Sequence, residues 1–219
     1  MTVVAPTLTF ERRMLKEYDL LISLDEVGRG ALAGPVAVGA AVMDAAGARR
    51  GVPEGLRDSK LIAEKRRSSI AERARQWVPT TGVGWASAAE VDAVGIMRAL
   101  GLAASRAVQA VVDQGVPLER TLVILDGNHD YVSKVHPVPL TVRPVIKGDR
   151  DCASVSVASV IAKVARDELM ASLHPEHPAY QWDRNKGYAS AEHRQAIREV
   201  GLSPLHRSSW AIAGVPTLF

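Results

Sequence analysis

Three short apolar segments of this chain each lead into an aspartate, and this repeated pattern constrains the fold more than any other feature. The segments are Asp19 to Leu24 (DLLISL), Thr121 to Leu125 (TLVIL) and Pro139 to Ile146 (PLTVRPVI), and the acids that follow them are Asp25, Asp126 and Asp149. Their length and their content of β-branched residues predict strands, each with a glycine turn nearby. Strand ends of an α/β sheet gather at one edge, where such sheets bind ligands. We therefore expect the three aspartates to lie close together, with Glu26 beside them.

The remaining segments complete an α/β pattern. Ser59 is placed as the cap of a helix over Lys60 to Trp77, and a capping box of Ser87 and Glu90 opens a helix to about Gln114 in which Gly95 can introduce a break. The other predicted elements are strands over Pro35 to Met43 and Thr81 to Ala86, and helices over Ala153 to Leu173 and Ser190 to Val200. Interleaved strands and helices predict a mixed β-sheet flanked by helices. We expect a catalytic domain over 1–173 and a C-terminal helical extension over 174–219.

Composition is that of a soluble globular protein, with 47% hydrophobic and 23% charged residues among 219. The longest apolar run, Ala31 to Met43, is interrupted by Gly34, Pro35 and Gly39, so no membrane-spanning helix is expected. The N-terminus does not resemble a secretory signal, and the lone Cys152 cannot form an intramolecular disulfide. These features predict a cytoplasmic protein, and we expect a monomer.

Positive charge is concentrated in three stretches although the net charge is only +3. They span Arg57 to Arg75, Arg143 to Arg150 and Arg184 to Arg198. Any one of them alone is typical of a solvated helix face. Together, flanking acidic motifs in a chain with a pI of about 9.2, they favour a polyanionic substrate.

The acids themselves point to a metal. We name Asp25, Glu26, Asp126 and Asp149 the carboxylate cluster. Four such acids at one sheet edge would raise one another's pKa unless a cation neutralised them, and oxygen ligands without a Cys or His pattern favour Mg²⁺ or Mn²⁺ over Zn²⁺. A single Asp after a strand is more often a turn residue or a helix cap. A glycosidase needs only two carboxylates, and 5% aromatic residues are few for sugar stacking.

A dinucleotide-binding protein is a second alternative, because Gly28 to Ala33 fits the pattern G-x-G-x-x-A after a strand. The context argues against it. Pro35 and the residues after it predict a strand where a helix is needed, and Arg49 and Arg50 stand where a ribose-binding acid would be expected. We therefore interpret these glycines as permitting close approach of the backbone to a ligand.

The stretch DEVGRGALAGPV, from Asp25 to Val36, resembles the signature of the ribonuclease HII family, the type 2 ribonucleases H. Further matches follow in the same order: RDSK (Arg57 to Lys60), ILDGN (Ile124 to Asn128), VIKGD (Val145 to Asp149), ASVIAKVARD (Ala158 to Asp167) and NKGYASAEH (Asn185 to His193). The resemblance spans nearly the whole chain. Departures are small: Ala31 stands where the family often has Pro, and Leu61 where many members have a second Lys.

This resemblance implies a ribonuclease H-like fold and an endoribonuclease. Its substrates would be RNA/DNA hybrids and single ribonucleotides in duplex DNA, cut on the 5′ side of the ribonucleotide to leave 3′-hydroxyl and 5′-phosphate ends. In the cell, such an enzyme serves removal of ribonucleotides and RNA primers. The carboxylate cluster would be catalytic and metal-binding, the GRG loop of Gly28, Arg29 and Gly30 would bind substrate, and Tyr188 would sense the RNA-to-DNA junction.

Two divalent ions, Mn²⁺ or Mg²⁺ about 3.5 to 4 Å apart, would activate the water and stabilise the leaving oxygen, with Asp25 as the bridging ligand. Further substrate-binding residues are predicted beside them: Lys60, Lys163 and Lys186 for phosphates, Asn128 for the backbone, Ser156 for support of Asp149 and a phosphate, and His193 through its motif alone. Another two-metal DNA nuclease on the same scaffold remains an alternative. So does a non-catalytic nucleic-acid-binding module, which would need only the basic stretches.

Overall fold

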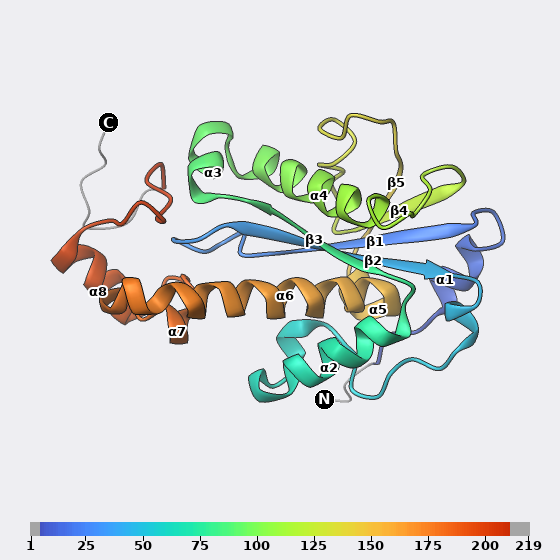
Figure 1. Ribbon diagram of the computed structural model, residues 1–219, viewed down its shortest axis with the longest axis horizontal. Coiled ribbons are helices and arrows are strands. Elements are labelled where there is room, and N and C mark those ends of the chain that lie inside the picture. The colour runs from blue at the N-terminus through green and yellow to red at the C-terminus, as the bar shows by residue number, and fades with distance from the viewer. Residues whose placement is uncertain (1–4, 211–219) are drawn as a thin grey trace.

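A five-stranded sheet in the order β3-β2-β1-β4-β5 forms the centre of the computed structural model, which describes residues 5–210 (Figure 1). The strands are β1 (Leu20–Val27), β2 (Val36–Asp44), β3 (Thr81–Ala86), β4 (Thr121–Asp126) and β5 (Thr141–Val145). The first three strands pair antiparallel, and β4 and β5 run parallel to β1. The predicted mixed sheet is therefore confirmed. The outermost parts of both predicted domains, 1–4 and 211–219, lie outside the described residues.

Helices cover both faces of this sheet, with α4 on one face and α6 and α2 on the other (Figure 1). The α-helices are α1 (Thr9–Met14), α2 (Glu64–Trp77), α3 (Ala88–Val94), α4 (Ile96–Val112), α5 (Gly148–Asp151), α6 (Ala153–Leu173), α7 (Trp182–Asn185) and α8 (Ala191–Val200). Short 3-10 turns are η1 (Gly47–Arg49), η2 (Ser59–Leu61), η3 (His174–Glu176) and η4 (Pro178–Tyr180). Because side chains alternate along a strand, Leu21 of β1 packs toward α6 while its neighbour Ile22 packs toward α4. Burial of both faces explains why the central residues of β1 and β4 are apolar, except for Ser23 of β1, which is hydrogen bonded to Ser154 at 2.7 Å.

Some of the predicted helix starts agree with the structure and others do not. The capping box of Ser87 and Glu90 is present, and Gly95, at φ 77°, separates α3 from α4. The prediction for Ser59 is wrong, because Ser59 begins the separate turn η2, which Asp58 caps through the Lys60 N–H. Helix α1 was not predicted at all, since six residues carry too short an apolar period to recognise.

The segment after α6 forms a compact extension that packs on the end of the sheet (Figure 1). Its core contains Tyr180, Trp182 and Ile197, which pack against Met170 of α6 and Ala33 of the β1–β2 loop. His193 and His206 are also buried there, with their Nε2 atoms 3.1 Å apart. The extension is therefore joined to the loop that follows β1.

These histidines make the fold sensitive to acid. Burial, and then His193, lower the pKa of His206 to about 4 from the ordinary 6.5. The folded protein thus takes up this proton less readily than the unfolded chain, so the stability that neutral His206 contributes is complete above pH 6.5 and is lost as the pH falls toward 4. Between about pH 7 and about pH 5, we expect the free energy of unfolding in urea to fall by on the order of 1 to 2 kcal/mol more in the wild type than in His206→Gln. The exposed His129, changed to Gln, is the control. An equal pH slope in wild type and His206→Gln would refute this expectation.

Candidate active site

A groove of about 480 Å³ opens at the edge of the sheet where β1 ends. Its lining includes two acids, the GRG loop, two turn residues and residues of α2, α6 and the extension: Asp25, Glu26, Val27, Gly28, Arg29, Gly30, Ser59, Lys60, Arg67, Lys163 and Tyr188. The sequence placed most of these residues at one site from four separate motifs. The sheet, α6 and the extension thus meet at this groove.

Strand register brings the first acids together. Leu24 of β1 lies opposite Leu125 of the parallel strand β4, so the next residues, Asp25 and Asp126, are neighbours. Asp25 is only 5% exposed, and it lies within β1 and not after its end. The predicted proximity of Asp25 and Asp126 therefore follows directly from the pairing of β1 with β4.

Asp149 reaches the cluster by a different route from the one predicted. Strand β5 ends at Val145, and Asp149 lies on the single helical turn α5. Lys147 takes a left-handed conformation with φ 60° and turns the chain back. The backbone N–H of Asp149 then donates to Asp126 Oδ1 at 3.2 Å. This hydrogen bond, in place of a strand end, sets Asp149 beside β4.

The four carboxyl groups act on one another electrostatically. Burial, followed by the charges of Glu26 and Asp126, raises the pKa of Asp25 well above its ordinary value. Burial and then Asp126 raise the pKa of Asp149 to about 6, against the opposing charge of Lys60, whose Nζ lies 3.8 Å from Asp149 Oδ2. Burial is also the first cause of the raised pKa of Asp126 and of Glu26. A bound cation would relieve this repulsion.

The carboxylate cluster fits a hard divalent ion by its chemistry, since its ligands are oxygens that repel one another at low solvent exposure. Within residues 5–210, no three His, Cys, Asp or Glu side chains are grouped so as to hold a metal ion as they stand. The GRG loop adds one cation at the rim, because Arg29 lies 3.8 Å from Glu26.

Tyr131 belongs to the site but was missed in the sequence. Its hydroxyl donates to Glu26 Oε2 at 3.3 Å, and burial followed by the charges of Glu26 and Asp25 raises its pKa well above the ordinary value. The residue comes from the loop after β4, where an aromatic side chain at an irregular position carries no periodic signal. Only the folded loop brings it to Glu26.

The predicted phosphate-binding lysines differ in how free they are. Lys60 has a side chain that is 75% exposed, at the mouth of the groove. Lys163 instead lies 2.7 Å from Asp167, which also contacts Arg67 at 3.4 Å. Lys163 is therefore held in place, while Lys60 can reach outward.

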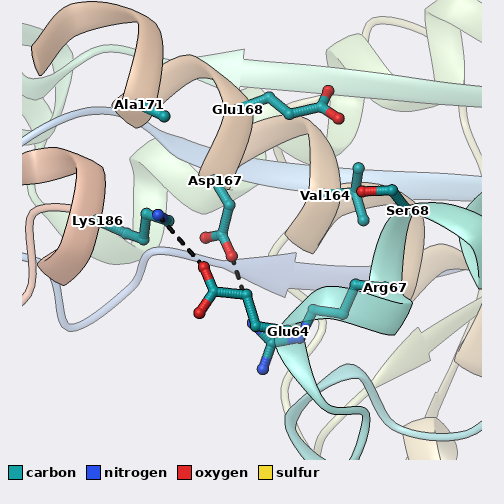
Figure 2. A pocket seen from close by; sticks show the side chains of 8 residues that line it. All are labelled: Glu64, Arg67, Ser68, Val164, Asp167, Glu168, Ala171 and Lys186. Atoms are coloured by element: carbon teal, nitrogen blue, oxygen red, sulfur yellow. Dashed lines mark hydrogen bonds and ion pairs between the residues drawn. The ribbon is translucent and has the colours of Figure 1, made fainter.

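A smaller pocket of about 180 Å³ lies beside the groove, between α2 and α6 (Figure 2). Lys186 lines it and lies 3.4 Å from Glu64, whose side chain is 70% exposed. Arg67 lines both cavities, and in Figure 2 it points to Asp167. Lys186 therefore belongs to this neighbouring pocket and not to the lining of the groove. Asn128, exposed directly after β4, does not line the groove either.

Two predicted substrate contacts are wrong because the side chains are fully buried. Ser156 donates to the carbonyl of Asp149 at 2.7 Å, so it supports that acid as expected but cannot touch a phosphate. His193 donates through Nδ1 to the carbonyl of Tyr188 at 2.8 Å, and Trp182 Nε1 donates to its Nε2. Its place in the motif therefore reflects support of the Tyr188 backbone.

The glycines of the GRG loop also differ from each other. Gly28 has φ +83°, and a Cβ there would lie 2.2 Å from Arg166 Nε. Gly30 has no neighbour within 4 Å of such a Cβ and no left-handed φ. Of these two glycines, only Gly28 therefore has a backbone conformation that requires glycine.

A mixed five-stranded sheet with helices on both faces and acids on its central parallel strands defines a ribonuclease H-like protein. The family model described as Ribonuclease HII matches residues 22–213. Ribonuclease HII of Streptomyces avermitilis is 49% identical over 208 residues, which cover 94% of this chain and 84% of the relative. The chain belongs to the ribonuclease HII family, and its class of activity is that of an endoribonuclease acting on nucleic acid.

Solved structures agree on the fold. Ribonuclease H2 of Pyrococcus horikoshii has a TM-score of 0.70 at 24% identity, covering 89% of this chain and 95% of its own. Bst-RNase HIII in complex with Mn²⁺ has a TM-score of 0.65 at 23% identity, covering 86% of this chain and 65% of its own. Helices that could cross a membrane do not occur within residues 5–210.

Proposed function

We propose that this protein incises RNA/DNA hybrids and duplex DNA containing single ribonucleotides. Incision falls on the 5′ side of the ribonucleotide and leaves 3′-hydroxyl and 5′-phosphate ends, and it serves removal of ribonucleotides and RNA primers. The observation that carries the proposal is the groove that joins Asp25 and Glu26 to the GRG loop and Tyr188. Acids for hydrolysis and backbone groups for sugar recognition then act on the same nucleotide.

The carboxylate cluster would hold two divalent ions, Mg²⁺ or Mn²⁺. When bound, such ions lower the pKa of water and stabilise the charge that develops on phosphate and leaving oxygens. The donor set supports this, as does the Mn²⁺ complex of a ribonuclease HIII with the same fold. Asp25 is the proposed shared ligand because it is the most buried acid of the carboxylate cluster and neighbours both Glu26, along β1, and Asp126, on the paired strand β4. Tyr131 orients Glu26, and Ser156 fixes the backbone of Asp149.

The remaining residues of the groove position the substrate. Lys60, exposed and near Asp149, attracts the phosphate next to the scissile bond. The GRG loop approaches the sugar, whose 2′-hydroxyl distinguishes RNA from DNA. Tyr188 packs with its ring beneath the ammonium of Lys163, 5.6 Å from the ring centre, and its hydroxyl accepts from the N–H of Gly28 at 3.2 Å. The ring is thereby tied to the loop that reads the sugar.

Three matched duplexes test the proposal: one with a single ribonucleotide, one with an all-RNA strand and one of DNA alone. Incubation with Mg²⁺ or Mn²⁺ should give a single 5′-side incision of the first, cleavage of the second and no cleavage of the third. Chelator should stop all cleavage, and Ca²⁺ should support it poorly because its larger, looser shell does not hold tight two-metal geometry. Comparable cutting of DNA alone would favour a DNA nuclease, and binding without any cleavage would favour a non-catalytic module.

Replacing Tyr188 by alanine should impair cutting at a lone ribonucleotide more than cutting of an all-RNA strand. Loss of stacking on the nucleotide beyond the junction is worth on the order of 1 to 3 kcal/mol, or roughly 5- to 150-fold in kcat/KM. The ratio of kcat/KM on the two duplexes measures this effect. Tyr188→Phe is the matched control, since it keeps the ring and removes only the hydroxyl bonded to Gly28. Equal losses on both duplexes would show that the ring serves packing alone.

A further inference from the structure

The loop between β1 and β2 has no regular secondary structure, and a buried arginine of the extension holds it from beneath. Arg207 is fully buried. Its guanidinium donates to the carbonyl oxygens of Gly28 at 2.6 Å, Arg29 at 2.9 Å and Gly34 at 3.2 Å. One side chain from the far end of the sequence therefore fixes three peptide groups of the loop.

A second buried arginine holds the rest of the same segment. Arg166 of α6 donates to the carbonyl oxygens of Pro35 at 2.9 Å, Ala33 at 3.0 Å and Lys186 at 2.8 Å. The Arg166 guanidinium also lies 5.2 Å from the centre of the Tyr188 ring. Arg166 thus joins the loop to the NKGY motif. Arg207 donates to the carbonyls of the GRG loop, where the carbonyl of Gly28 also accepts from the N–H of Ala31 at 3.2 Å.

Arg207 is itself held firmly. The backbone N–H groups of Ser208 and Ser209 donate to the carboxylate of Asp92 at 2.9 and 3.1 Å, and the ring of Trp210 lies 4.8 Å from the guanidinium. Burial lowers the pKa of Arg207 to about 10. Burying a cation whose hydrogen-bond acceptors are carbonyls is costly for stability, and a planar fork of donors suits several carbonyls as an ammonium does not. Such a residue is better explained by the geometry it imposes than by the stability it adds.

Arg207 fixes the direction of two backbone donors, the N–H groups of Arg29 and Gly30. A peptide group is planar and trans, so fixing the carbonyl of Gly28 fixes the N–H of Arg29, and fixing the carbonyl of Arg29 fixes the N–H of Gly30. These N–H groups point away from Arg207, since they lie opposite to the carbonyls. Within residues 5–210 neither has a hydrogen-bond partner. Both residues are exposed and line the groove.

We propose that Arg207 is a positioning residue that aims the N–H groups of Arg29 and Gly30 at the sugar and phosphate oxygens of the ribonucleotide. The inference rests on the proposed function and adds to it. It gives the C-terminal extension a direct part in substrate recognition, although the guanidinium itself never touches the nucleic acid.

Arg207→Lys tests this role because it keeps the charge and removes the fork. We expect KM for the single-ribonucleotide duplex to rise about 10-fold or more, since small misplacements of binding groups have effects of that order. The loss of binding should be measurable without cleavage as well, on an Asp25→Asn background, as weaker preference for the ribonucleotide duplex over DNA. Arg13→Lys, at an exposed position of α1 outside the groove, is the matched control and should behave as wild type.

Ile197→Ala distinguishes positioning of the loop by Arg207 from a general effect on stability. This variant opens a cavity in the core of the extension and leaves the contacts to the loop carbonyls unchanged. If Ile197→Ala lowers Tm as much as Arg207→Lys and raises KM equally, Arg207 acts only through stability and the inference is overturned. An unchanged KM in Arg207→Lys also overturns it. A wild type that cuts no ribonucleotide duplex instead refutes the proposed function, and the inference with it.

Discussion

Replacing Asp25 with asparagine should abolish cleavage while making the metal-free protein more stable. Loss of the shared ligand removes charge stabilisation worth several kcal/mol, so kcat should fall by about a thousandfold or more. Duplex binding should remain measurable, because Lys60 and the GRG loop are untouched. Turnover near the wild-type rate in this variant would exclude the proposed mechanism.

The gain in stability follows from the sign of the pKa shift. The pKa of Asp25 is raised in the folded protein, first by burial and then by Glu26 and Asp126. Folding is therefore favoured by protonation of Asp25, and the stability that this protonated group contributes to the metal-free protein is lost as the pH rises through the raised pKa. Asparagine of the same shape removes that penalty at neutral pH. The expected increase in Tm should be present in chelator at about pH 7 and should shrink in acid.

A bound divalent ion should reverse the order of the two Tm values, so that the wild type becomes more stable than Asp25→Asn. A divalent ion that binds the folded wild type stabilises it by mass action, so Mg²⁺ or Mn²⁺ should raise the Tm of the wild type more than that of Asp25→Asn. Asp19→Asn is the control, because Asp19 lies just before the other end of β1 with a side chain that is 65% exposed. That variant should keep its activity and its response to metal. A lower Tm for metal-free Asp25→Asn would mean that the acid is structural.

The proximity of Asp25 and Asp126 could be predicted from the sequence because it depends on local rules. Apolar strands with both faces buried are recognisable, and neighbouring parallel strands end at the same edge. Asp149 was assigned to the right cluster but the wrong element. The turn at Lys147 needs a left-handed conformation in a residue other than glycine, and composition does not reveal such a turn.

The supporting residues could not be predicted, because their contacts join parts of the chain that are distant in sequence. Arg207, near the C-terminal end of the chain, donates to the carbonyl of Gly28. Tyr131, in the loop after β4, donates to Glu26 of β1. His193 was predicted to contact substrate because it lies in a recognised motif, but its side chain is buried. Membership of a motif shows that a residue matters to the site, and only packing shows which atoms it touches.

The two glycines of the GRG loop should respond differently to the same small substitution. Gly28→Ala places a methyl group 2.2 Å from Arg166 Nε at a φ of +83°. Strain of this kind costs on the order of 1 to 3 kcal/mol, and displacement of the loop should reduce kcat/KM by about 100-fold. Both Tm and kcat/KM on the single-ribonucleotide duplex should therefore fall.

Gly30→Ala meets open space and an ordinary backbone conformation, so its Tm should equal that of the wild type. Any loss of activity must then arise where the substrate lies. Gly30→Val enlarges the side chain at the same point, and we expect kcat/KM to fall further while Tm stays unchanged, because the methyl groups occupy the approach of the sugar. Discrimination against DNA should weaken in parallel. If Gly30→Val instead cuts the single-ribonucleotide duplex normally, the sugar does not approach this loop, and recognition of the 2′-hydroxyl must be sought elsewhere in the groove.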